Sequence, residues 1–112
     1  MEKLDWKILK DEEGLQKLKE NSALKPQVIY KHSNRCFISS IVRNRLEKSP
    51  APGMDFHFLD LISHRSLSNK IAADFKVSHE SPQVLVIKNT VCVYDASHDN
   101  IEMEELAMFA AN

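Results

Sequence analysis

The segment QVIYKHSNRCFIS, residues 27–39, joins a short apolar run to a polar turn and a cysteine. Residues 27–31 are rich in β-branched and aromatic side chains, which predicts a buried strand. Beyond the turn, apolar residues recur at helical spacing and predict a helix that begins near Cys36 and ends before Pro50. Where a strand turns directly into a helix, the turn lies at the carboxyl edge of the sheet, and open α/β folds hold their functional groups at this edge.

The residues before and after this segment predict further elements of the same kind. Trp6–Ile8 is expected to form a short strand, and Asp11 can cap a helix that runs to about Asn21. After a cluster of helix-breaking residues at 49–53, the alternating pattern of Asp55–Asp60 predicts a third strand.

The last part of the chain is expected to hold a helix, a hairpin and a final helix. Ser66 can cap the first of these helices, which carries apolar residues at positions 67, 71 and 75. The apolar runs 84–87 and 91–94 flank three turn residues and predict a tight hairpin. Asp99 and Glu102 have the spacing of a capping box for the final helix, which reaches position 109.

Together these elements follow the order β-α-β-α-β-α-β-β-α. Alternating strands and helices favour parallel strands with helices on both faces of the sheet, and the hairpin adds an antiparallel pair. We therefore expect an α/β protein with a central mixed sheet, and the thioredoxin-like fold has this order of elements. The length suits a single thioredoxin-like domain over residues 1–112.

The composition argues against several classes of protein. A net charge of −1 gives no electrostatic reason to expect nucleic acid or a membrane surface as a partner. No apolar run approaches the roughly 18 residues of a spanning helix, and the charged residues 1–5 lack the core of a signal peptide. The sequence therefore indicates a cytoplasmic protein. Its two cysteines and five scattered histidines have no metal-ligand spacing, so no metal site is expected.

Cys36 has the sequence surroundings of a reactive cysteine. A thiol at the start of a helix faces unpaired backbone N–H groups and the positive end of the helix dipole, and both favour the thiolate. Lys31 and Arg35 add positive charge nearby, and His32 can add more. The alternative is a small buried cysteine that only packs against the helix.

Ser39 stands three residues after Cys36, where a dithiol redox protein would carry its second cysteine. Its hydroxyl can donate a hydrogen bond to a Cys36 thiolate, or it can be an ordinary polar residue of the helix. Cys92 is expected in the core near the far end of the hairpin, about 15–20 Å from the active edge. A disulfide needs Cα atoms within about 7 Å. The chemistry is therefore expected to be monothiol, with an outside thiol removing the adduct from Cys36.

Three other segments are expected to reach the same edge of the sheet. Ser81–Pro82 precedes the hairpin, and a cis bond there would leave the backbone of Ser81 free to pair with a substrate opposite Cys36. The loop 63–65, which ends in Arg65, and His98 after the last strand should return to this edge. Taken singly, these residues suit solvated loops, but their convergence favours a functional role.

The chain resembles the YtxJ-like monothiol bacilliredoxins of the bacillithiol system over nearly its whole length. The resemblance rests on KHS and CFIS within 31–39, HRSLS at 64–68, HESPQ at 79–83 and SH at 97–98. It implies a thioredoxin fold, a Gram-positive cytosol that makes bacillithiol, and removal of bacillithiol from S-bacillithiolated proteins. It also implies that Cys36 is the attacking thiol and that Pro82 is a cis-proline facing it. The family commonly has proline directly after the cysteine, where this chain has Phe37.

The sequence and the resemblance together predict a monothiol thiol–disulfide oxidoreductase. Its cosubstrate would be bacillithiol, with no tightly bound cofactor. Its partners would be S-bacillithiolated proteins and, for recycling, a low-molecular-weight thiol or a disulfide reductase. Because bacillithiol carries a malate with two carboxylates, a basic rim would help to hold it. The residues expected to bind substrate around the thiol are Lys31, His32, Arg35, Arg65, Ser81, Pro82 and His98.

Two other interpretations stay open at this point. One keeps the fold and drops catalysis: a redox-sensing or partner-binding module in which Cys36 is merely modified. The other, weaker one is a reductase of an inorganic oxyanion, which would usually need further cysteines, whereas only Cys92 is available.

Overall fold

Five strands form one mixed sheet in the computed structural model, which describes residues 4–49 and 53–110. Across the sheet the order is β1-β3-β2-β4-β5, in which β1, β3 and β2 are parallel. β4 runs antiparallel to β2, and β5 runs antiparallel to β4. The strands are β1 (Trp6–Ile8), β2 (Gln27–His32), β3 (Asp55–Asp60), β4 (Gln83–Lys88) and β5 (Val91–Ser97). All six residues of β2, the central strand, are buried, as the apolar run predicts.

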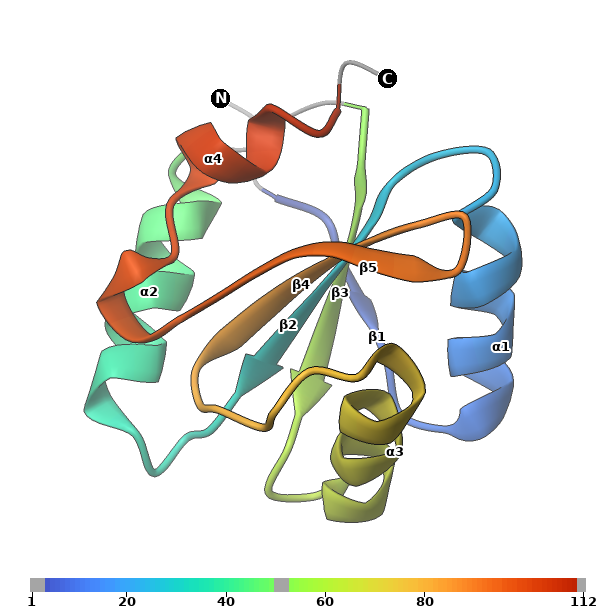
Figure 1. The fold of residues 1–112 in the computed structure, drawn as a ribbon. Coiled ribbons are helices and arrows are strands. Elements are labelled where there is room, and N and C mark those ends of the chain that lie inside the picture. The colour runs from blue at the N-terminus through green and yellow to red at the C-terminus, as the bar shows by residue number, and fades with distance from the viewer. Residues whose placement is uncertain (1–3, 50–52, 111–112) are drawn as a thin grey trace.

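Helices cover both faces of this sheet (Figure 1). One face carries α1 (Glu12–Asn21) and α3 (Arg65–Phe75), and the other carries α2 (Phe37–Glu47) and α4 (Met103–Ala107). Successive side chains of a strand point to opposite faces. Within β2, Tyr30 therefore joins the core beneath α2, whereas Ile29 joins the core beneath α1 and α3.

The predicted order of elements and the α/β fold class are confirmed. Trp6–Ile8 is a strand, and Asp11 caps α1 by accepting the N–H of Gly14 at 2.8 Å. α2 ends at Glu47. Residues 50–52 of the predicted breaker cluster lie outside the described residues. None of the helices in the described ranges is long and apolar enough to cross a bilayer.

Two helix starts differ from the sequence prediction. α3 begins after His64 and not at Ser66, because the Asp60 carboxylate accepts the N–H groups of residues 62 and 63 and turns the chain early. The capping box of Asp99 and Glu102 does not form. A 3₁₀ turn, His98–Asn100, leads to the fully buried Ile101, and α4 then starts after Glu102 without a side-chain cap.

Candidate active site

Cys36 lies in the turn that joins β2 to α2. It is the N-cap residue of α2, with an extended backbone (φ −108°, ψ 113°), and its side chain is partly exposed. Its N–H donates to the carbonyl of Ser33, and its carbonyl accepts the N–H of Ser39, each at 3.1 Å. The cysteine therefore stands at the N-terminus of a helix and at the carboxyl edge of the sheet, as predicted from the sequence.

The backbone around Pro82 faces this cysteine. The bond between Ser81 and Pro82 is cis, and Cys36 Sγ lies 3.9 Å from the carbonyl oxygen of Ser81. His98 joins the same edge, because its N–H donates to the carbonyl of Pro82 at 2.9 Å and its Nε2 lies 3.4 Å from a carboxylate oxygen of Glu80. Cys36, Ser81, Pro82 and His98 thus converge, although they come from segments far apart in the sequence.

Ser39 does not turn its hydroxyl toward Cys36, which corrects the sequence expectation. Its Oγ is fully buried, lies 2.7 Å from Nδ1 of His32, and accepts the N–H of Ser33 at 3.2 Å. Burial, and next the charge of Arg43, lowers the pKa of His32, which favours the neutral ring. The Ser39 hydroxyl is therefore paired with His32, with Ser33 and, at 3.3 Å, with the hydroxyl of Tyr30, and Cys36 is not among its hydrogen-bond partners in the described part of the chain.

Tyr30 is a site residue that the sequence analysis missed. Its hydroxyl donates to the backbone carbonyl of Ser39 at 2.6 Å, and this contact ties α2 to the middle of the sheet. Burial raises the pKa of Tyr30 to about 12, so the hydroxyl stays protonated as a donor. The alternation of side chains along β2 could have revealed Tyr30, because it puts Tyr30 and His32 on the same face, below the start of α2.

Replacing Ser39 with alanine is expected to lower the free energy of unfolding by about 1–3 kcal/mol, because it leaves the buried N–H of Ser33 and the ring of His32 without their partner. Urea unfolding measures this loss. Ser40→Ala is the matched control, since Ser40 is the exposed neighbour on the same helix and should change stability little. Equal unfolding midpoints for the two variants would contradict the role given to the Ser39 hydroxyl.

Lys31 and His32 do not belong to an exposed basic rim, which is a second correction. Lys31 is fully buried on the α3 side of the sheet, where its Nζ donates to the carbonyl of Ser68 at 3.1 Å. Burial lowers the pKa of Lys31 to about 8. His32 is buried on the opposite face, between Ser39 and the ring of Phe58, whose centroid lies 5.0 Å away. Both side chains are thus structural partners of the helices that cover the sheet.

Arg35 and Arg65 are the exposed cations left from the predicted rim. Arg35 precedes the cysteine, and Arg65 begins α3. The pKa of His79, in the segment before Ser81, is lowered by burial, then by Lys31 and by Arg65. Arg65 is therefore near enough to this segment to act on it electrostatically.

The sequence matches the family model described as monothiol bacilliredoxin BrxC over residues 7–106. The chain belongs to this family. The match includes Cys36, Ser39 and the segment around Pro82, so the bacilliredoxin relationship covers every residue of the edge described above.

Solved structures support the same fold. A protein described as a candidate oxidoreductase with a thioredoxin fold is 28% identical, with a TM-score of 0.75 over 90% of this chain and 89% of that chain. Thioredoxin from Malassezia sympodialis is 11% identical, with a TM-score of 0.77 over 96% and 92%. Thioredoxin from Fasciola hepatica is 18% identical, with a TM-score of 0.72 over 93% and 98%. This bacilliredoxin-family chain is thus a thioredoxin-fold member of an oxidoreductase family.

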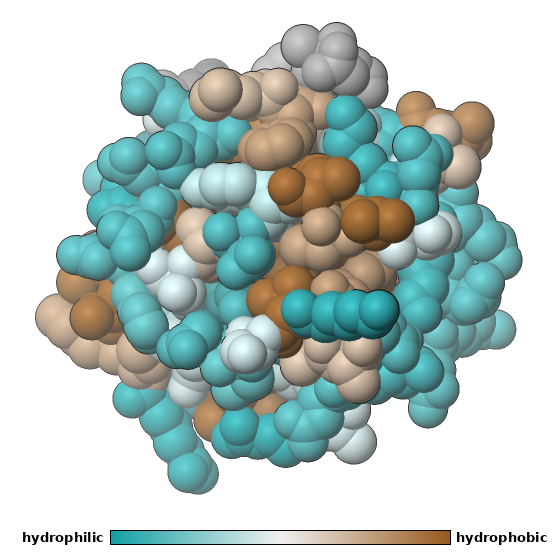
Figure 2. Space-filling view, in the orientation of Figure 1, coloured by the Kyte–Doolittle hydropathy of each residue, from teal (hydrophilic) through white to brown (hydrophobic). Residues whose placement is uncertain are grey.

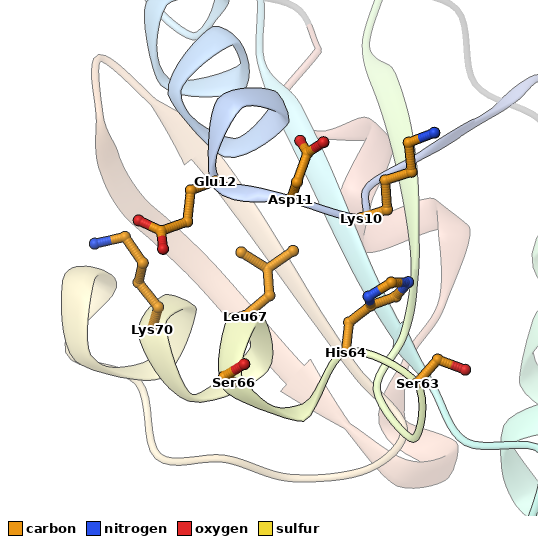
Figure 3. Close-up of a pocket in the computed structure, with 8 residues that line it drawn as sticks. All are labelled: Lys10, Asp11, Glu12, Ser63, His64, Ser66, Leu67 and Lys70. Atoms are coloured by element: carbon orange, nitrogen blue, oxygen red, sulfur yellow. The ribbon is translucent and has the colours of Figure 1, made fainter.

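A cavity of about 340 Å³ opens beside the start of α3 (Figure 3). The segment that leads into α1 supplies one wall, and α3 with the two residues before it supplies the other; the lining residues are Lys10, Asp11, Glu12, Ser63, His64, Ser66, Leu67 and Lys70. His64 points into this cavity, and neither Cys36 nor any residue expected to bind substrate lines it. Within the loop 63–65, His64 is thus directed away from Cys36, and the Ser63 hydroxyl donates to a carboxylate oxygen of Asp60 at 3.2 Å.

Cys92 lies at the hairpin end of the sheet, as predicted. It pairs with Ile87 near the start of β5, while Ser97 at the other end of β5 pairs with Gln83, next to Pro82. The separation along the strand is about 17 Å at roughly 3.3 Å per residue. The thiol packs against the core beneath α1 and α3 and donates to the carbonyl of Tyr94 at 3.3 Å, and burial raises its pKa. A bond between Cys36 and Cys92 would require rearrangement of the fold.

Proposed function

We propose that the protein removes bacillithiol from S-bacillithiolated proteins as a monothiol thiol–disulfide oxidoreductase, with Cys36 as the nucleophile. The position of Cys36 Sγ carries the proposal. Cys36 is partly exposed at the N-terminus of α2, and its Sγ lies 3.9 Å from the carbonyl oxygen of Ser81, beside the cis bond to Pro82. Membership of the bacilliredoxin family supports bacillithiol as the cosubstrate. No tightly bound cofactor enters this chemistry.

The proposed first step is a thiol–disulfide exchange. The Cys36 thiolate attacks the bacillithiol sulfur of the client's mixed disulfide, so that a new S–S bond joins Cys36 to bacillithiol while the bond to the client breaks. The client sulfur leaves as a thiolate, which takes a proton from water. Cys36 is oxidised and the client cysteine is reduced, so the electrons balance within the three sulfurs.

The second step requires a thiol from outside. Ser39 has no sulfur with which to attack the Cys36 adduct, and Cys92 lies at the hairpin end of the sheet. A low-molecular-weight thiol or a disulfide reductase therefore attacks the bacillithiol sulfur of the adduct. A new disulfide forms between bacillithiol and the attacking thiol, and Cys36 leaves as a thiolate.

The surroundings of Cys36 suit such an adduct. The Ser81 carbonyl beside the thiol can accept a hydrogen bond from a substrate amide. Arg35 and Arg65 are exposed cations in the segments that follow the carboxyl ends of β2 and β3, and they can hold the malate carboxylates of bacillithiol. His98, whose side chain is half-exposed, lies next to Pro82 at the same edge of the sheet.

Intact-mass analysis tests the proposal directly. The reduced protein is mixed with a client that carries one bacillithiolated cysteine, and both masses are followed with time. We expect the protein to gain one bacillithiol on Cys36 as the client loses one. A client that keeps its bacillithiol while Cys36 stays unmodified near neutral pH would overturn the proposal and favour a non-catalytic thioredoxin-like binding module.

A further inference from the structure

Three apolar side chains lie exposed on the first turns of α2, immediately after Cys36. Phe37 is 82% exposed, Ile38 41% and Ile41 46%. We call these three residues the α2 apolar face. In Figure 2, hydrophobic atoms gather at the left edge of the molecule, over α2, among hydrophilic surroundings.

The core does not explain why these residues are apolar. The residues with which α2 packs on the sheet are Val42 and Leu46, both fully buried. Phe37 and Ile41 are four residues apart, so they are neighbours on the helix surface, and Ile38 lies three residues before Ile41. An exposed cluster of this kind beside a nucleophile is typical of an interaction surface rather than of a solvated helix.

The chemistry of the surroundings indicates what covers this face. A client that delivers a disulfide to Cys36 brings its own surface next to the start of α2, because Cys36 is the N-cap residue of this helix. Bacillithiol carries two carboxylates, which gain nothing from an apolar surface and suit Arg35 and Arg65 instead. An apolar side chain of the client next to its modified cysteine would be removed from water by Phe37.

We propose that the α2 apolar face docks the client protein and selects clients that carry an apolar side chain beside the bacillithiolated cysteine. This inference rests on the proposed function, since it assigns a surface to the partner of that reaction. Phe37 is then a specificity residue that contacts the protein part of the substrate, while Arg35 and Arg65 bind the bacillithiol part.

The test compares two substrates for each variant: a bacillithiolated client protein and a small disulfide that contains bacillithiol. The measured quantity is the ratio of the second-order rate constant with the protein to that with the small disulfide. We expect Phe37→Ser and Ile41→Ser each to lower this ratio, the former by about tenfold, and Phe37→Leu to restore most of it. Leu24→Ser is the matched control, because Leu24 is 90% exposed in the loop between α1 and β2 and should leave the ratio unchanged.

An unchanged ratio in both serine variants would overturn the docking proposal. If the wild-type protein is in that case a dimer that these variants convert to a monomer, the face binds a second copy of the chain instead of a client. Failure of the proposed function is distinguishable, since the wild-type protein would then transfer bacillithiol from neither substrate.

Discussion

A Cys36→Ser variant is expected to lose the transfer of bacillithiol almost completely, with a fall in kcat/KM on the order of 10³-fold or more. The reaction requires a sulfur nucleophile that forms a disulfide, and a serine hydroxyl forms none. The fold should persist, because Cys36 is partly exposed and its N-cap role involves no side-chain hydrogen bond to the helix. Client mass measured against time, with circular dichroism as the check on folding, gives both results.

Cys92→Ser is the control for this prediction. Cys92 lies at the hairpin end of the sheet, pairs with Ile87 and packs beside the core, so its loss should affect stability more than exchange. We expect kcat/KM to stay within about threefold of the wild-type value. A loss in Cys92→Ser as large as that in Cys36→Ser would show that the mechanism uses two thiols and would refute monothiol chemistry.

Acidification is expected to destabilise the fold through His57, by about 2 kcal/mol between pH 7 and pH 5. His57 is buried in β3, and burial lowers its pKa to about 4; Asp55 raises this pKa slightly and Lys7 lowers it slightly. Its Nε2 lies 2.8 Å from Oε1 of Gln27, while the amide nitrogen of Gln27 donates to Lys25 and Asp55. The amide oxygen must accept, so the neutral ring donates at Nε2.

The sign of this effect follows from the two pKa values. The folded pKa of His57, about 4, lies below the ordinary value of 6.5, so the unfolded chain binds a proton first as the pH falls. The stabilisation is fully present above about pH 6.5 and is lost progressively toward pH 4.

Urea unfolding of wild-type protein and of His57→Gln at pH 7 and pH 5 isolates this contribution. Glutamine can donate an amide N–H to Gln27 without titrating, and all other titratable groups are common to both proteins. The variant should therefore lose about 2 kcal/mol less than the wild type on acidification. Equal losses in the two proteins would contradict the assignment to His57.

Local patterns were sufficient for the order of elements and for the position of the cysteine. The apolar run 27–31 and the helical spacing after Cys36 are short-range signals, and they place the cysteine at the start of α2. The cap on α1 at Asp11 was predictable for the same reason, since its partner Gly14 is three residues away. The cap predicted at Ser66 failed, because the carboxylate of Asp60 closes the turn before it.

The roles of the polar residues near Cys36 were not predictable in this way. Lys31 and His32 are adjacent in the sequence, yet the sheet sends them to opposite faces, where their partners are Ser68 on α3 and Ser39 on α2. Proximity to a turn suggested exposed cations, whereas both side chains are buried. Whether each of these side chains is buried, and which residue it bonds to, depends on which helix covers that face of the sheet.

The sequence by itself determined that a lone cysteine begins a helix at the carboxyl edge of an α/β sheet, with serine three residues on. This holds because strand and helix periodicity are local properties of the chain. Only the tertiary structure decided that the Ser39 hydroxyl pairs with His32, that Lys31 supports α3, and that Phe37 remains uncovered beside the thiol. Hydrogen-bond partners and burial come from segments distant in sequence, and no local pattern encodes them.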